Sequence, residues 1–289
     1  MIAGSDLPTL RIRTRAFIGE TDPQFWTSEI IDMHINDEIM ALQREIIDLN
    51  QGYLERVQTI TPTSATNTLP IGLYVVRGLD VSIGGQWTPL DWIQAGHRFL
   101  YQSTTGVTEA IAVRFENRSF ILESGYSNAT SIRMHYGKLS APLRTETMVA
   151  ATSTSFTMGS TAPMINDCFN GQEGLVLAGT GAGQYFIIDD YVGSTQVATV
   201  STWSVNPDTT SSYSLLLCDP LDKFPEIVCA GAAIRALLRR RDTDLTGLIS
   251  SFYQPGKVAM LASLRKRQVS IPSRVNYYPD LDEMFPFNE

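Results

Sequence analysis

The chain has 289 residues, a net charge of -8 and three cysteines. Its length suits one large or two modest domains, and we expect two. A hydrophobic share of 43% and a charged share of 18% are ordinary for globular proteins and exclude a wholly disordered or fibrous chain. The acidic balance disfavours non-specific nucleic-acid binding over the whole surface, although a local basic patch remains compatible with it.

Targeting signals and membrane segments are not expected. The longest apolar runs, such as 71–76 and 227–234, are much shorter than the roughly 20 residues that span a bilayer. Residues 1–10 lack the basic start, apolar stretch and cleavage site of a secretion signal, so we expect a cytoplasmic location. The cysteines Cys168, Cys218 and Cys229 are odd in number and far apart, which favours buried thiols over disulfides or metal ligation.

A long amphipathic helix is predicted near the N-terminus, over 22–49. Its apolar residues recur at steps of three and four: Ile31, Ile35, Ile39, Leu42, Ile46 and Leu49. Asp22-Pro23 suits a helix start, and Asn50-Gln51-Gly52 suits a helix end.

A β-rich stretch follows, in two parts. Runs of β-branched and aromatic residues predict strands at 72–77, 110–115 and 131–136, and the alternation within the last of these predicts a sheet with one solvated face. Residues 144–217, rich in Thr, Ser and Gly, are predicted to form a separate inserted β domain. Its candidate strands are 174–178, 184–188, 196–200 and 213–217.

Helical periodicity returns at Ile227, and the small residues of 230–233 would let another helix approach closely. A further helical segment over 245–264 is predicted to be interrupted at Pro255. The last residues hold three prolines and no period, so we expect an extended arm. The predicted fold class is α+β. The expected parts are 1–143 (N-terminal helix and β region), 144–217 (inserted β domain), 218–268 (helices that form a bundle with the N-terminal helix) and 269–289 (arm).

No catalytic, cofactor or metal site is predicted. The loop Gly179-Thr-Gly-Ala-Gly-Gln184 lacks the following helix and the lysine of a phosphate loop, so we interpret it as a β-turn. His34, His97 and His135 have no partner at metal-ligand spacing, and no G-x-S-x-G motif occurs. Asp189-Asp190 would point to opposite faces of a strand unless that strand is bulged. The carboxylates of 280–283 suit solvated or calcium-binding turns.

Positive charge gathers late in the chain, at Arg235, 239–241, Lys257 and 265–267. Helix stability explains part of this pattern, since cations suit a helix C-terminus. The rest indicates an acidic partner, more plausibly a protein surface than nucleic acid, because no aromatic residue interleaves 239–241 to stack bases. Together with aromatic residues of the arm, the candidate partner interface is Arg239, Arg240, Arg241, Arg265, Lys266, Arg267, Tyr277, Tyr278, Phe285 and Phe287.

The order of motifs resembles that of head-to-tail adaptor proteins of tailed bacteriophages, also called connector or head completion proteins. The resemblance rests on Phe25-Trp26 and 29–37 at the opening helix, on the strand 131–136 with its Tyr136, and on Phe224-Pro225 before an Ala-rich helix. A second resemblance, to a β module of phage neck and tail proteins, rests on 179–183, 188–194, Trp203 and 207–213. This chain differs from small adaptors in the size of the stretch 144–217.

Family membership implies a non-enzymatic virion protein, made in the bacterial cytoplasm and located at the head–tail junction. It implies a homo-oligomeric ring, commonly of twelve subunits, that binds the portal and tail or nozzle proteins, with an arm docked on the portal. Genomic DNA would pass through the channel without sequence-specific binding. No membrane partner is implied. Two rival hypotheses are a receptor- or carbohydrate-binding tail module, suggested by Trp203 and Tyr213, and a cell-wall hydrolase, disfavoured by the missing metal and carboxylate spacing.

Overall fold

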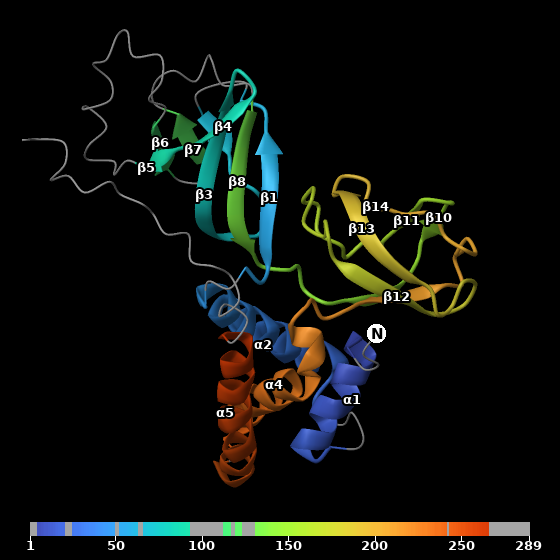
Figure 1. Cartoon of the computed structure of the whole chain (residues 1–289). Helices are drawn as coiled ribbons and strands as arrows, with labels where there is room; N and C mark the ends of the chain where they lie inside the picture. Colours follow the sequence, from blue (N-terminus) through green and yellow to red (C-terminus); the bar gives the residue numbers. More distant parts are fainter. Residues whose placement is uncertain are drawn as a thin grey trace, which may run out of the picture.

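The computed structural model describes residues 5–20, 25–49, 52–62, 66–92, 112–116, 119–122, 131–241 and 243–265. In this part of the chain, four α-helices lie beside two β regions (Figure 1). Within these residues the sheets are antiparallel apart from one short parallel pair, so the chain is a mixed helix-and-sheet protein consistent with the α+β class. No helix in the described part of the chain is long and apolar enough to cross a membrane.

The four helices are α1 (Leu7–Ile18), α2 (Ser28–Asp48), α4 (Pro225–Arg240) and α5 (Thr243–Arg265). Helix α1 was not predicted, although its signals are present in the sequence. The Asp6 carboxylate accepts a hydrogen bond from the Thr9 amide, a proline occupies the first turn, and Gly19 closes the helix in the left-handed conformation. Its buried residues Leu7, Leu10 and Ile18 recur with helical spacing.

Helix α2 begins later than predicted. Thr27 caps it by accepting a hydrogen bond from the Ile30 amide, whereas Asp22-Pro23 lies outside the described residues. The predicted apolar stripe is confirmed: Ile31, Ile35, Ile39, Leu42 and Ile46 are all buried. The helix ends at Asp48, close to the predicted stop.

The predicted interruption at Pro255 is wrong, because helix α5 continues through that residue. Proline removes one backbone donor and crowds the preceding turn, which ordinarily kinks or ends a helix. Here the buried side chains Ile249 and Tyr253 before the proline, and Met260 and Leu264 after it, hold both halves against the other helices. Tertiary packing therefore overrides the local preference of proline.

The first β region, residues 55–138, holds two four-stranded sheets over one apolar cluster. One sheet has the order β1 (Glu55–Ile60), β8 (Ser131–Lys138), β3 (Leu73–Ile83), β4 (Gln86–Pro89). The other has the order β2 (Thr66–Thr68), β7 (Ser119–Leu122), β6 (Ala112–Glu116), β5 (Asp91–Trp92). The predicted alternation is confirmed, because Ile132, Met134 and Tyr136 are buried while Arg133 and His135 are partly exposed.

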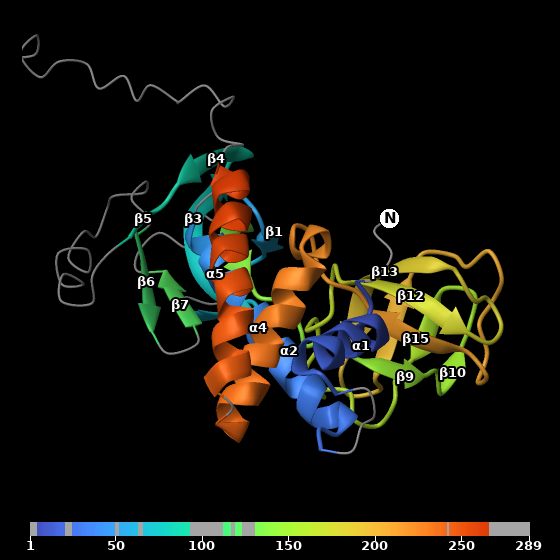
Figure 2. The ribbon, with the colours of Figure 1, turned by 90° about the horizontal axis from the view of Figure 1, so that it is seen from below.

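The second β region, residues 145–215, is a single seven-stranded sheet that curls into a half-barrel (Figure 2). Its spatial order is β10 (Ala150–Ala151), β11 (Ser155–Thr157), β14 (Val197–Val200), β13 (Tyr185–Val192), β12 (Glu173–Ala178), β15 (Ser212–Leu215), β9 (Thr145–Thr147). The four strands predicted here are confirmed. Phe156 packs edge-on against Phe186, Trp203 and Tyr213 at the centre.

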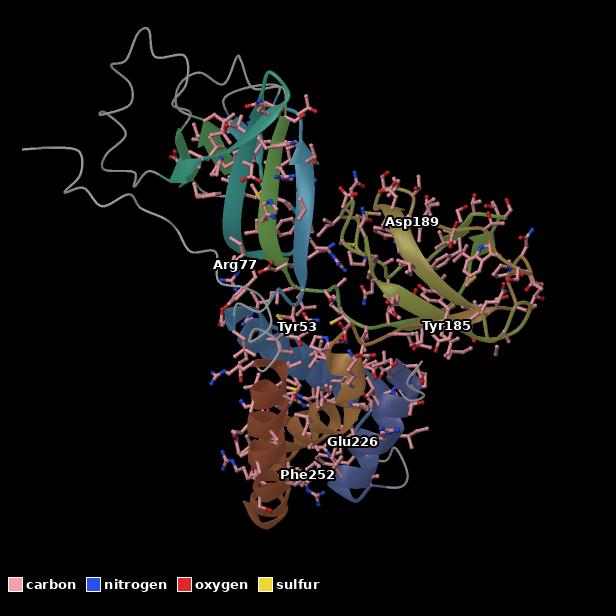
Figure 3. The ribbon with its side chains drawn as sticks, viewed as in Figure 1. Tyr53, Arg77, Tyr185, Asp189, Glu226 and Phe252 are labelled. Atoms are coloured by element: carbon pink, nitrogen blue, oxygen red, sulfur yellow. The ribbon has the colours of Figure 1, made fainter. Side chains whose placement is uncertain are left out.

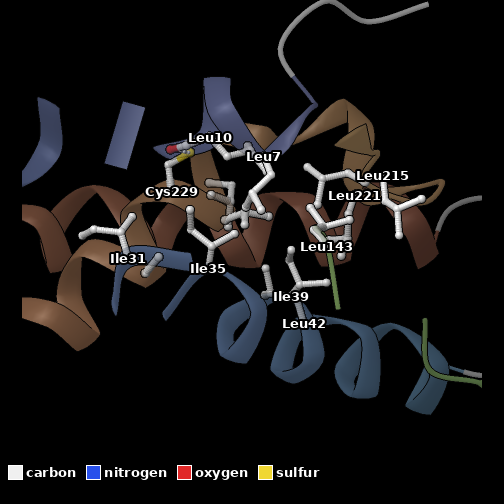
Figure 4. Packing of buried hydrophobic residues seen from close by; sticks show 14 of the residues in the cluster. Leu7, Leu10, Ile31, Ile35, Ile39, Leu42, Leu143, Leu215, Leu221 and Cys229 are labelled. Carbon is white, nitrogen blue, oxygen red and sulfur yellow. Dashed lines mark hydrogen bonds between the residues drawn. The ribbon is translucent and has the colours of Figure 1, made fainter. Parts of the chain in front are cut away.

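The second β region and the helices share one apolar core (Figure 4). The start of α1 lies on β15, where the Leu7 amide donates to Ser214 Oγ at 3.1 Å. Just beyond the strand, the Leu217 amide donates to the Ser5 carbonyl, also at 3.1 Å. A short 3-10 helix, η3 (Leu221–Lys223), then leads into α4. The N-terminal helix thus connects the curled sheet to the other helices.

Candidate interface at the end of helix α4

Helix α4 carries the predicted basic residues on a well-defined helix. Phe224 precedes it and Pro225 occupies its first position, where the missing N–H has no intrahelical acceptor to lose. Arg239 and Arg240 lie in the last turn, where their charge favours the helix dipole. Arg241 ends the helix in the left-handed conformation, with φ of 62°.

A buried carboxylate holds α4 against its neighbours. Glu38 of α2 is 3% exposed, and its Oε2 accepts a hydrogen bond from Arg235 Nε at 2.7 Å. The hydroxyl of Tyr253, on α5, donates to its other oxygen, and burial together with Glu38 raises the pKa of that tyrosine. One carboxylate therefore ties three helices together, and both partners are needed because a buried unpaired charge is strongly unfavourable.

The small-residue stretch of α4 makes this contact possible. A Cβ placed on Gly231 would lie 2.4 Å from the Glu38 carboxyl carbon, so only glycine admits the carboxylate here. The predicted close approach of another helix at 230–233 is confirmed, and that helix is α2. Sequence reasoning missed Glu38 itself. Its signal was its position three residues after Ile35, within the buried stripe of α2.

The last turn of α4 exposes a cluster of positive charge. Arg239, Arg240 and Arg241 are exposed, and none forms an ion pair with a carboxylate among the described residues. The guanidinium of Arg240 instead lies 5.5 Å from the ring centre of Phe25, which is 61% exposed. Such cation–π stacking orients the guanidinium without neutralising it. We call Phe25 and Arg239–Arg241 the arginine corner.

Two buried ring nitrogens lie behind the arginine corner. Neither Trp26 Nε1 nor His34 Nε2 has a hydrogen-bond partner among the described residues, and the two rings lie 6.1 Å apart. Burial lowers the pKa of His34, and Arg239 and Arg235 lower it further against the opposing effect of Asp37.

Of the other predicted interface residues, Arg265 alone belongs to the described part of the chain, and it does not join this corner. Arg265 lies at the opposite end of α5, whose 23 residues span about 35 Å. Lys257 is paired with Glu45 at 2.9 Å. Outside the described residues lie Lys266, Arg267, Tyr277, Tyr278, Phe285 and Phe287. The basic residues that are close in sequence number thus form at least two separate sites.

The structure also shows where the glycine-rich loop, the Asp189-Asp190 pair and the possible metal ligands lie. Gly179, Gly181 and Gly183 all have positive φ and lie in a turn between β12 and β13, which confirms the β-turn interpretation. A bulge between Ile188 and Asp190 in the pairing of β13 leaves Asp189, labelled in Figure 3, and Asp190 both exposed. Among the residues the structure describes, no group of three or more histidine, cysteine or acidic side chains could hold a metal ion.

The aromatic residues that suggested a carbohydrate-binding face are buried. Trp203 is 6% exposed and Tyr213 is fully buried, so neither ring is available to a ligand. Tyr213 donates to Glu146 at 3.3 Å, and desolvation with the nearby Glu146 charge raises its pKa. The expected exposure of these two rings, which was part of the motivation for that rival hypothesis, is therefore wrong.

Comparison with protein-family models and with curated proteins finds no match.

Proposed function

We propose that this chain is a structural protein of the phage neck, which forms a homo-oligomeric ring between the portal and the tail. The observation that carries the proposal is the arginine corner: three exposed arginines, without an ion-pair partner among the described residues, at the end of a helix held by Glu38. An exposed cluster of positive charge suits docking onto an acidic protein surface, where complementary charge speeds encounter and selects the partner.

Within this proposal, α1, α2, α4 and α5 form one helical bundle module that builds the ring. Residues 144–217 are an inserted β domain facing tail or nozzle components. The net charge of -8 suits a channel along which DNA slides without sticking, because like charges oppose phosphate contact. The protein has no catalytic role in this scheme, and twelve is the expected subunit number.

The first test is the mass of the full-length protein, alone and mixed with the cognate portal, followed by electron microscopy of the mixture. The expected result is a ring seated on the portal, with a mass that is a multiple of the 32.0 kDa chain. A protein that stays monomeric at all concentrations and never joins the portal would exclude the proposal.

The second test addresses the arginine corner. Replacing Arg239, Arg240 and Arg241 by alanine should weaken portal docking and flatten its dependence on salt, because screened charge–charge attraction is lost. Arg44→Ala is the matched control, since Arg44 is exposed on α2 and forms no ion pair with a described residue, only a hydrogen bond to Met40. Unchanged docking and salt dependence in the triple variant would remove the assigned role of the corner.

A further inference from the structure

A groove separates the two β regions. It has a volume of about 680 Å³, within the usual range of ligand clefts, roughly 300–1,000 Å³. Strand β1 supplies one wall, residues 67–71 a second, and the turn 167–171 of the second β region a third. In Figure 1, β1 is the strand of its sheet nearest to β13.

One edge of β1 is unpaired within the described residues, because β1 is the outermost strand of its sheet. The Lys138 amide donates to the Leu54 carbonyl, so the alternation of an antiparallel ladder turns the backbone of Glu55, Val57 and Thr59 away from β8. Outward N–H and C=O groups of this kind are a template for one more strand.

Two cations line the same groove. Arg56 has no hydrogen bond or ion pair with any described residue, and its guanidinium lies against Gly171. Lys138 Nζ donates only to backbone carbonyls, at 3.0 Å to Asn170 and 3.4 Å to Asp167. Burial lowers the pKa of Lys138, and the charge of Arg56 lowers it further. The side chains of Arg56 and Lys138 therefore lie close together, and neither pairs with a carboxylate of a described residue.

The charge balance of the groove favours an acidic occupant. Its one lining carboxylate is Asp167, which already accepts a hydrogen bond from Asn170 Nδ2 at 2.9 Å. Apolar side chains continue the groove beyond the cations, with Val57 56% exposed and Ile71 42% exposed. A fitting ligand is therefore an extended peptide that carries both carboxylates and apolar side chains.

The chain contains such a peptide. Residues 280–285, Asp-Leu-Asp-Glu-Met-Phe, lie between Pro279 and Pro286 and lie outside the described residues. Proline cannot donate to a ladder, so pairing would be confined to this stretch, which matches the six residues of β1 in length. In an extended conformation Asp280 and Asp282 share one face.

The distance from α5 is compatible with docking within one chain. Tyr253 and Lys257 of α5 contact Glu38 and Glu45 of α2, so the two helices run in the same direction and end at a similar level. The end of α2 packs under the first β region, where Ile47 would meet a Cβ on Gly137 of β8 at 2.6 Å. Residues 266–279 can span up to about 45 Å when extended, which is longer than the 23-residue helix α5 itself.

We propose that residues 280–285 add to the free edge of β1 as an extra strand of the same chain, with Asp280 and Asp282 directed to Arg56 and Lys138. This inference concerns a contact within the free chain and does not depend on the proposed neck function. It is therefore tested on the free full-length protein, with no portal present.

Amide hydrogen exchange of the full-length protein tests the strand pairing. The outward amides of Val57 and Thr59 should exchange slowly, and Leu281→Pro should speed their exchange at least tenfold by removing a ladder donor. Ser273→Pro, outside the pairing stretch, is the matched control and should leave the exchange unchanged. Fast exchange of both amides in the unaltered protein, or no effect of Leu281→Pro, would overturn the proposal.

A labelled peptide of residues 276–289 tests the charge contacts. Added to the full-length Leu281→Pro protein, whose own segment no longer competes, it should bind at β1. A second substitution, Arg56→Gln, should weaken binding about twofold to fivefold, as expected for a partly exposed ion pair. Adding Arg44→Gln instead should leave binding unchanged. Equal weakening by both arginine substitutions would overturn the assignment of Arg56.

A cysteine pair distinguishes the source of the segment. Gln58→Cys with Asp282→Cys, in a protein with Cys168, Cys218 and Cys229 replaced by serine, should oxidise to an intrachain disulfide at low protein concentration. Crosslinked dimers that grow with concentration would show that the segment comes from a second copy, and would overturn pairing within one chain.

Discussion

Glu38 and Gly231 are in direct contact across two helices, since a Cβ on Gly231 would lie 2.4 Å from the Glu38 carboxyl carbon. The contact matters because the same carboxylate accepts hydrogen bonds from Arg235 and Tyr253. Any shift of Glu38 therefore disturbs three helices, one of which, α4, carries the arginine corner.

Gly231→Ala should destabilise the protein by about 1–3 kcal/mol, the usual cost of overpacking a close contact. In an open helix the same change is favourable by up to about 1 kcal/mol. Gly247→Ala is the matched control, because Gly247 lies in α5 with nothing within 4 Å of the new Cβ. Urea unfolding of both variants measures the difference, and equal stability of the two would contradict the packing argument.

Tyr253→Phe should destabilise the protein by about 1.5–3 kcal/mol, because it removes a buried hydrogen bond to a charged group. Tyr74→Phe is the control, since the Tyr74 hydroxyl is exposed and lies 3.4 Å from Asp48 Oδ2. Thermal unfolding should separate the two variants clearly. Similar melting temperatures would mean that Glu38 is satisfied without Tyr253.

Trp203→Ala should destabilise the protein by about 3–5 kcal/mol, because it removes a large side chain from the centre of the curled sheet. Trp87→Ala should have a much smaller effect, since Trp87 is 40% exposed and packs on Arg133 at 4.5 Å. Urea unfolding compares them. If Trp203→Ala left the stability unchanged but abolished glycan binding, the carbohydrate-binding hypothesis would be restored.

The carboxyl of Asp208 should make the free energy of unfolding depend on pH at acidic pH. Hydrogen bonds from Thr180 and then Thr210 lower its pKa to about 2 in the folded protein, from 3.8. Its folded pKa is depressed, so its contribution is present above the unfolded pKa and is lost as pH falls from about 4 to 2. The unaltered protein should therefore lose more stability across that window than Asp208→Asn. Parallel pH profiles of the two urea midpoints would contradict this.

Local features of the sequence determined much of the secondary structure. The apolar stripe of α2, the strands of both β regions and the turn at 179–183 were predictable because side-chain periodicity and glycine conformation act between near neighbours. Helix α1 was also predictable from Asp6, the proline after it and Gly19, and was overlooked.

Only the tertiary structure decided which of these residues meet. Burial of Glu38 and Trp203, continuity of α5 through Pro255 and separation of Arg265 from the arginine corner all depend on contacts between distant segments. The free edge of β1 became visible only once the sheet order was known. Sequence periodicity shows which face of an element is buried, but the partner of that face is chosen by packing over the whole chain.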